Sequence, residues 1–200
     1  MKFSLIATLA ALSIDQTQAT ISSGDCPKTV NTMPGFAVGP YLGRWYDMSS
    51  DFFFAGPCTT ATYMLKENGN VQIKNRGWFW WFFFSYYSVL GEASCSDTDI
   101  GKCWVNFGTS KLTQEGPSNY NVLYTDYDNV SLVYSCSDTI FGKDENGWVL
   151  TRDWNISEAK VNEYEAKFKE LMPTWGGSLS KHDQGTNRAP DCTYLPEIYA

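Results

Sequence analysis

Short segments with high β-propensity recur at even spacing along most of this chain, and few folds accommodate such a pattern. The segments are rich in Val, Thr, Tyr and Trp and are separated by turn residues such as Asn68-Gly69. We expect strands at residues 43–49, 58–66, 71–75, 88–95, 102–107, 120–125, 130–136 and 148–153. These strands predict an all-β fold, an eight-stranded up-and-down antiparallel β-barrel. A barrel of this size has room inside for one small ligand.

One amphipathic helix is expected after the last strand, at residues 155–172, packed outside the barrel. Asn155 or Ser157 caps its start, and Pro173 ends it. Apolar residues at spacings of three and four form one stripe along it: Val161, Tyr164, Phe168 and Leu171.

The first residues of the chain predict export from the cell. Lys2 precedes an apolar run, a polar stretch follows, and Ala19 offers a small residue at the cleavage point. We therefore interpret residues 1–19 as a secretory signal peptide and 20–200 as a single secreted, extracellular domain. Its expected parts are an N-terminal arm at 20–40, the barrel at 41–154, the helix, and a disulfide-tethered tail at 173–200.

Charge and composition narrow the partners. The net charge is −7, and it stays the same without the signal peptide, which holds one Lys and one Asp. An acidic protein is disfavoured as a partner of nucleic acid or of anionic membrane surfaces. No later run is long and apolar enough to cross a membrane. Aromatic residues make up 16% of the chain and charged residues only 18%, which favours a domain that surrounds an apolar ligand or packs against another protein.

The chain holds six cysteines: Cys26, Cys58, Cys95, Cys103, Cys136 and Cys192. An even number in an exported chain predicts three disulfides, for which fifteen connectivities exist. Cys95 and Cys103 flank one expected hairpin, and this geometry pairs them with each other. There is no Cys-x-x-Cys spacing and His182 is the only histidine, so no metal site is expected.

The sequence offers no catalytic group of residues. Disulfides account for every cysteine, which leaves no thiol nucleophile, and no acid or base partner can be placed beside His182. Asp126 and Asp128 form a turn, where aspartates usually bond to their own backbone. We therefore expect no enzyme activity. Asn129 and Asn155 begin Asn-x-Ser sequons near turns, which makes both of them candidate glycosylation sites.

An aromatic run occupies residues 78–87, where nine of ten positions are Trp, Phe or Tyr. Such a strand places rings on both faces, so it is either a core strand buried on both sides, a loop at a ligand mouth, an oligomer interface or an edge that contacts a membrane. Loop position alone suggests these residues at the mouth of the barrel: Phe52, Phe53, Trp80, Trp81 and Phe83.

Three segments carry a family resemblance. They are Gly43-Arg44-Trp45 at the first strand, Thr125-Asp126-Tyr127-Asp128 at a turn, and Arg152 at the end of the last strand. In this order and followed by a helix, they resemble the lipocalin family, over residues 24–195. Within it the chain is most similar to apolipoprotein D and to the arthropod pigment-binding members insecticyanin, bilin-binding protein and crustacyanin, through Tyr41–Tyr46, Cys58 with Tyr63, and Tyr124–Cys136.

The resemblance implies structural roles. It pairs Cys26 with Cys136 and Cys58 with Cys192, whereas the third pair departs from the family pattern. It also implies that the Arg152 guanidinium lies over the Trp45 indole at the closed end of the barrel, where Gly43 lets the chain turn. This cation–π contact would form a barrel floor with no part in catalysis.

The resemblance further implies a carrier of a small hydrophobic ligand. By the match to apolipoprotein D, Tyr63, Asn121 and Trp148 face the cavity, and strand alternation from Asn121 adds Leu123. Basic residues near the mouth are sparse, which favours a carotenoid, retinoid, sterol or fatty acid over a bilin. The alternatives are a bilin-binding subunit of a homo- or hetero-oligomer, or an interaction module that docks on a lipid surface through residues 78–87. A bound chromophore or lipid is the only cofactor-like group expected.

Overall fold

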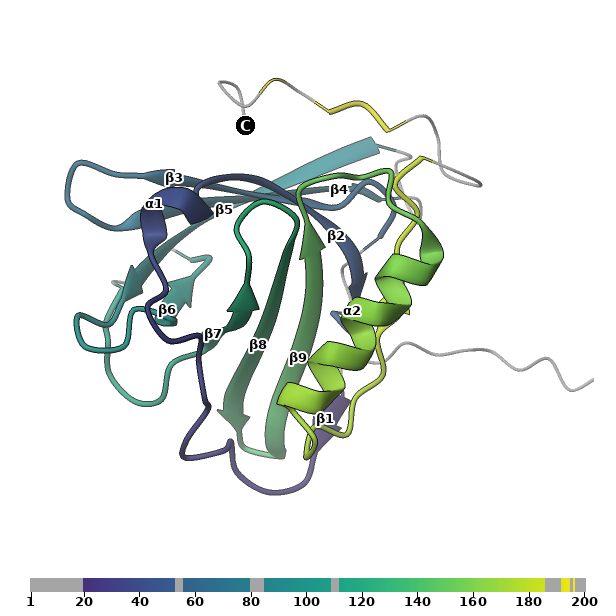
Figure 1. Ribbon diagram of the computed structural model, residues 1–200. Coiled ribbons are helices and arrows are strands. Elements are labelled where there is room, and N and C mark those ends of the chain that lie inside the picture. Colours follow the sequence, from purple (N-terminus) through teal and green to yellow (C-terminus); the bar gives the residue numbers. More distant parts are fainter. Residues whose placement is uncertain are drawn as a thin grey trace, which may run out of the picture.

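The computed structural model describes residues 20–52, 56–79, 85–108, 112–185, 192–194 and 196. Eight antiparallel strands form a ring: β2 (Gly43–Ser50), β3 (Thr60–Leu65), β4 (Val71–Phe79), β5 (Ser85–Cys95), β6 (Lys102–Asn106), β7 (Tyr120–Thr125), β8 (Val130–Thr139) and β9 (Gly142–Thr151). Each strand pairs with the next along the chain, and β9 pairs back with β2 (Figure 1). The predicted eight-stranded up-and-down barrel is therefore confirmed.

Two further strands lie where β2 and β9 close the ring. β1 (Thr20–Ser22) pairs with the part of β9 beyond its pairing with β2, and β10 (Ser180–Lys181) pairs with the part of β2 beyond its pairing with β3. Both cover backbone groups that would otherwise form open sheet edges. The N-terminal arm at 20–40 contains β1 and most of a short helix, α1 (Val38–Tyr41).

Several strands are longer than the sequence pattern predicts. β9 begins at Gly142, six residues before the predicted start at residue 148. The sequence did not predict this part of the strand because the polar stretch at 143–146 lacks the alternation typical of a strand. β4 reaches Phe79 and β5 begins at Ser85, so the described part of the aromatic run belongs to one hairpin. The remaining residues of that run, at 80–84, lie outside the described residues.

The predicted helix is present as α2 (Glu158–Leu171). Ser157 is its N-cap, and the Ser157 hydroxyl accepts a hydrogen bond from the Lys160 N–H at 3.3 Å. The helix contacts β9, β8 and β2 and lies along the outer face of the sheet (Figure 1). Gly147 permits this approach, since a Cβ there would lie 2.5 Å from the Phe168 ring. Leu171, expected in the apolar stripe, is 41% exposed, and Met172, the next residue, is buried in its place.

The core has two layers, one on each side of the sheet. Inside the ring, a cluster around Trp45 fills the closed end and includes Val122 and Val133. Outside, Leu123 and Leu132 pack with α2. Neighbouring residues of β7 and β8 therefore face opposite layers, as the pleat of a strand requires.

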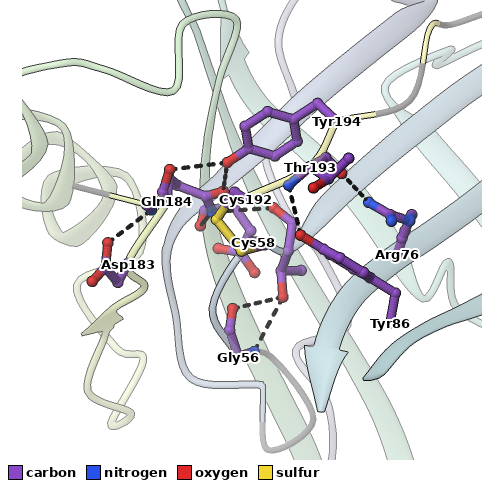
Figure 2. The surroundings of a disulfide bond; sticks show 12 residues. Gly56, Cys58, Arg76, Tyr86, Asp183, Gln184, Cys192, Thr193 and Tyr194 are labelled. Carbon is purple, nitrogen blue, oxygen red and sulfur yellow. Dashed lines mark hydrogen bonds between the residues drawn. A yellow bond between two sulfur atoms is a disulfide. The ribbon is translucent and has the colours of Figure 1, made fainter. Parts of the chain in front are cut away.

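Three disulfides are present, with the pairing that the resemblance and the hairpin geometry implied: Cys26–Cys136, Cys58–Cys192 and Cys95–Cys103. Figure 2 shows the second of these, which ties the tail to the start of β3. Beside it, the Arg76 guanidinium donates to the Thr193 carbonyl at 2.6 Å, and the Tyr194 hydroxyl donates to Gln184 Oε1 at 2.7 Å. The tail is thus fixed by covalent and polar contacts.

Trp45 and Arg152 form the floor of the barrel. Trp45 is fully buried, and its indole N–H donates to the Tyr41 carbonyl at 2.9 Å. The Arg152 Cζ lies 3.8 Å from the centroid of the Trp45 ring. Its nitrogens donate to five carbonyls, those of Pro40, Tyr41, Leu42, Arg44 and Tyr127. Gly43 supplies the positive φ, +92°, that turns the chain into β2.

Replacement of Arg152 should weaken this end of the barrel. Arg152→Ala removes the cation–π contact and leaves carbonyls without donors, so we expect the free energy of unfolding to fall by about 2 kcal/mol or more. Arg152→Lys keeps the charge but loses the planar guanidinium, so its free energy of unfolding should lie between those of Arg152→Ala and the native protein. Lys169→Ala, an exposed change on α2, is the control. Urea unfolding measures all three, and an Arg152→Ala midpoint equal to that of the native protein would contradict the role.

Candidate ligand cavity

A cavity of about 700 Å³ lies inside the ring. All eight strands of the ring contribute to its wall, which makes it the interior of the barrel and not a surface groove. The volume falls in the range of small-molecule sites. Its apolar and aromatic wall includes Tyr63, Ile73, Val105, Tyr120, Trp148 and Leu150.

A network of tyrosine hydroxyls joins the cavity to the floor. The Tyr120 hydroxyl lies 2.8 Å from that of Tyr63 and 3.0 Å from that of Tyr41, and the Tyr41 hydroxyl lies 2.9 Å from Ser131 Oγ. Burial raises the pKa of all three tyrosines above the ordinary value of 10.0. These hydroxyls are therefore neutral, and they satisfy one another as they hold the rings in place.

Two carboxylates, Asp47 and Asp144, belong to the cavity wall. Asp47 is 3% exposed, and its Oδ2 accepts from the Ser50 hydroxyl at 3.0 Å. Ser50 Oγ in turn lies 2.8 Å from His182 Nε2. Burial raises the pKa of Asp47, and the nearby His182 and the hydrogen bond from Ser50 oppose that shift.

A third carboxylate, Asp51, is also buried but is not part of the cavity wall. Its Oδ1 accepts from the Gly147 N–H at 2.7 Å, which links the end of β2 to β9. Burial raises the pKa of Asp51 to about 7, and the charges of Asp144 and Asp47 add to the shift. Asp51 therefore changes charge near neutral pH while it stays inside the protein.

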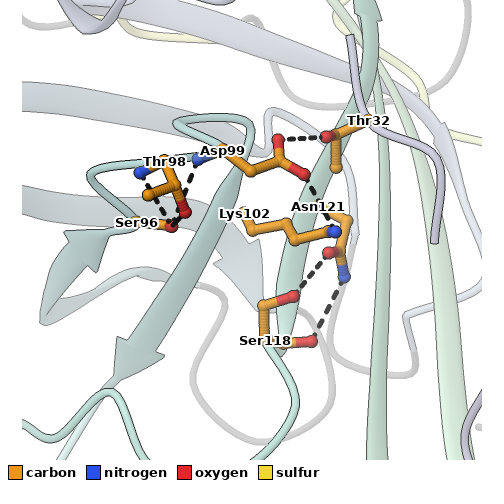
Figure 3. Close-up of polar contacts among 7 residues, drawn as sticks. All are labelled: Thr32, Ser96, Thr98, Asp99, Lys102, Ser118 and Asn121. Carbon is orange, nitrogen blue, oxygen red and sulfur yellow. Dashed lines mark hydrogen bonds and ion pairs between the residues drawn. The ribbon is translucent and has the colours of Figure 1, made fainter. Parts of the chain in front are cut away.

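The structure brings together only some of the residues predicted for the cavity. Tyr63, Trp148 and the predicted mouth residue Phe52 line it. Asn121 and Leu123 do not, so their assignment to the cavity is wrong. Figure 3 shows Asn121 bonded to Ser118, and its amide also donates to the Tyr134 carbonyl at 3.3 Å.

The error is one of strand phase. Tyr120 and Val122 point into the barrel, so Asn121 and Leu123 point outward, and Leu123 packs beneath α2. Both faces of β7 are buried, which leaves the period-two pattern without a polar face to set its phase.

The other predicted mouth residues, Phe53, Trp80, Trp81 and Phe83, lie outside the described residues. Among the described part of the aromatic run, Tyr87 lines the cavity. Trp78 instead stacks edge-on against Tyr86, with ring centroids 5.0 Å apart. The sequon residues Asn129 and Asn155 are both exposed.

The polar residues of the wall were missed, although a signal for them exists. Asp47, Asn75 and Asn146 stand two positions from Trp45, Ile73 and Trp148, which all face the interior. Residues two apart in a strand share a face, so each of these inward neighbours predicts an inward polar side chain. Within the described part of the chain, no group of three metal-ligating side chains is found, and no helix has the length and hydropathy to span a bilayer.

A closed eight-stranded barrel, an external helix and one ligand-sized interior define a class of single-domain proteins built around a central cavity. A model described as a lipocalin-like domain matches residues 36–177, and the chain belongs to the lipocalin family. This confirms the resemblance drawn from the three sequence segments. Members of the family are generally carriers of small hydrophobic ligands and are typically not enzymes.

Individual relatives agree with this assignment. Apolipoprotein D from Cavia porcellus is 34% identical over 170 residues, which is 80% of this chain and 84% of that protein. Insecticyanin from Manduca sexta has a TM-score of 0.63 at 19% identity, over 86% of this chain and 92% of its own. Lobster apocrustacyanin A1 has a TM-score of 0.56 at 22% identity, over 74% and 79%. At these identities the two structures show a shared fold alone.

The raised pKa of Asp51 predicts how stability depends on pH. The folded protein holds this proton up to about pH 7, whereas the unfolded chain releases it near 3.8. The contribution of Asp51 is therefore full below about pH 4 and is lost as the pH rises through 7. Asp51→Asn keeps the acceptor for the Gly147 N–H and removes the charge, so this variant should unfold at higher urea than the native protein at pH 8.

At pH 4 the urea midpoints of Asp51→Asn and the native protein should differ less than at pH 8, because native Asp51 is then protonated and uncharged. Asp128→Asn, at an exposed turn position, serves as the control and should follow the native pH profile. If Asp51→Asn loses as much stability between pH 4 and pH 8 as the native protein does, a group other than Asp51 causes that loss.

Proposed function

We propose that this protein is an extracellular carrier that binds one small hydrophobic ligand inside its barrel. The observation that carries the proposal is the cavity of about 700 Å³ lined by every strand of the ring. An apolar molecule that enters such a cavity loses its contact with water, and this is the main driving force for binding. The carrier role common in lipocalins supports the same conclusion.

Secretion is part of the proposal. The six cysteines all form disulfides, which persist in oxidising compartments, and the first 19 residues have the pattern of a signal peptide. The similarity to apolipoprotein D supports the same location. Glycosylation at Asn129 and Asn155 is consistent with it, because both side chains are exposed.

The ligand classes proposed are a retinoid, a carotenoid, a sterol or a fatty acid. A bilin has less support, because it carries two propionates and the described cavity wall contains no Lys, Arg or His. The likeness to insecticyanin and crustacyanin concerns the fold, so it does not favour a pigment.

A substitution that fills the cavity tests the proposal. Val89, 41% exposed, lines the cavity, whereas Leu90, the next residue of β5 and 57% exposed, is not part of the cavity wall. Val89→Trp places a large ring in the ligand's space, and we expect it to weaken binding at least tenfold. Leu90→Trp adds the same ring outside and should bind as the native protein does.

The measurement is the fluorescence of N-phenyl-1-naphthylamine, a neutral apolar dye that brightens in apolar sites. Titration of each protein gives a dissociation constant, and near-ultraviolet circular dichroism checks the fold of both variants. Equal dye binding by Val89→Trp and Leu90→Trp would exclude the barrel interior as the site. No dye binding by the native protein would argue against a carrier.

A further inference from the structure

The apolar cavity contains oxygen atoms that nothing satisfies among the described residues. Asp47 Oδ1, Asn75 Oδ1 and Asn146 Oδ1 are each buried without a hydrogen-bond partner there, and all three residues line the cavity. Asp47 and Asn146 are 3% and 5% exposed. Most buried polar atoms in proteins are hydrogen-bonded, so three such acceptors around one cavity need a reason.

Asp47 is the best candidate of the three to bind a ligand, because all of its other polar atoms have hydrogen-bond partners. Its N–H donates to the Thr59 carbonyl at 3.0 Å, and its carbonyl accepts from Gln184 Nε2 at 2.7 Å. Its Oδ2 accepts from Ser50. Only Oδ1 is left, on a side chain that belongs to the cavity wall.

The amide of Asn146 is oriented by a similar contact. Its Nδ2 donates to Asp144 Oδ1 at 3.1 Å, which leaves its own Oδ1 as the unsatisfied atom. The unsatisfied atoms that these wall residues carry are therefore all acceptors. An unsatisfied buried acceptor is costly, and more so when it is charged, so a ligand that supplies a donor recovers that cost.

The charges of the wall act in the same direction. Apart from tyrosines, the ionisable residues of the described wall are two carboxylates, Asp47 and Asp144, with no Lys, Arg or His among them. A ligand carboxylate that enters this low-dielectric space meets two carboxyl groups and no basic side chain of the wall. A hydroxyl or an ammonium group meets acceptors instead.

We propose that the ligand of this cavity carries a hydrogen-bond donor, a hydroxyl or an amine, which Asp47 Oδ1 accepts. The inference rests on the proposed carrier function and narrows its ligands to apolar alcohols and amines. Among molecules with the same tail, the cavity selects the donor-ended member over the carboxylic acid. Fatty acids thereby become the least suited of the ligand classes considered above.

The test uses four retinoids with one tail: retinol, retinylamine, retinal and retinoic acid. Each displaces N-phenyl-1-naphthylamine from the native protein at pH 8, where retinoic acid is ionised. We expect retinol or retinylamine to displace the dye at a concentration at least tenfold below retinoic acid, the size of one charge-assisted hydrogen bond. Retinal, which only accepts, should resemble the acid. The better of the two donors identifies a hydroxyl or an ammonium end.

The variant Asp47→Asn separates the hydrogen bond from other effects. In this variant the amide oxygen accepts from the Ser50 hydroxyl, and the amide N–H₂ group, a donor, takes the place of Oδ1. The preference for the alcohol over the acid should therefore vanish or reverse. Asp51→Asn removes a neighbouring buried carboxylate that is not part of the wall, and it should keep the native preference.

Each outcome has a distinct meaning. Equal displacement by retinol and retinoic acid in the native protein, or full native selectivity in Asp47→Asn, overturns the inference while the carrier function stands. Absence of dye binding overturns the carrier function itself. If no retinoid displaces bound dye, hexadecanol, hexadecylamine and hexadecanoic acid replace them under the same criteria. Failure of both donor-ended series also overturns the inference.

Discussion

The pairing of β9 with β2 is the contact on which the rest of this structure depends. It turns a meander of strands into a ring, and only a ring has an interior. The first strand of the ring must pair with the last, about a hundred residues apart in sequence, so closure carries a large entropic cost. Arg152 supports the closure directly, because it stands just after β9 and its guanidinium binds the carbonyls that precede β2.

The sequence predicts this closed end well and the interior wall poorly, for one physical reason. The floor depends on residue types with few substitutes: a glycine at positive φ, a large indole, and a guanidinium that reaches several carbonyls. The resemblance to the lipocalins, which these residues carry, therefore implied the contact between Arg152 and Trp45. The direction of a side chain in a strand depends instead on phase, and β7 is buried on both faces, so Asn121 and Leu123 were placed on the wrong side.

The polar part of the wall was hidden by a different effect. Residues 143–146 are Lys, Asp, Glu and Asn, residue types that are depleted in strands, yet they form four of the ten residues of β9. They pair because β8 continues beside them and β1 covers their other edge. Asp47 was visible in the sequence, but its meaning depended on the ring. A strand aspartate is ordinary at a surface and unusual inside an apolar barrel. Local rules are expected to fail in this way at functional positions.

Asp47 also connects the cavity to the closure. It lies on β2 opposite Leu150 of β9, where the pairing of the two strands shifts register between Asp47 and Ser49. A bulge of this kind re-aims side chains and loosens a ladder locally. The tail reinforces this weak point, since Gln184 binds the Asp47 carbonyl and is itself held by Tyr194, next to the Cys58–Cys192 disulfide. A donor on Asp47 Oδ1 would complete the hydrogen bonding of this residue. Ligand binding and barrel closure would then stabilise each other, because the same carboxylate belongs to the cavity wall and to a strand that closes the ring.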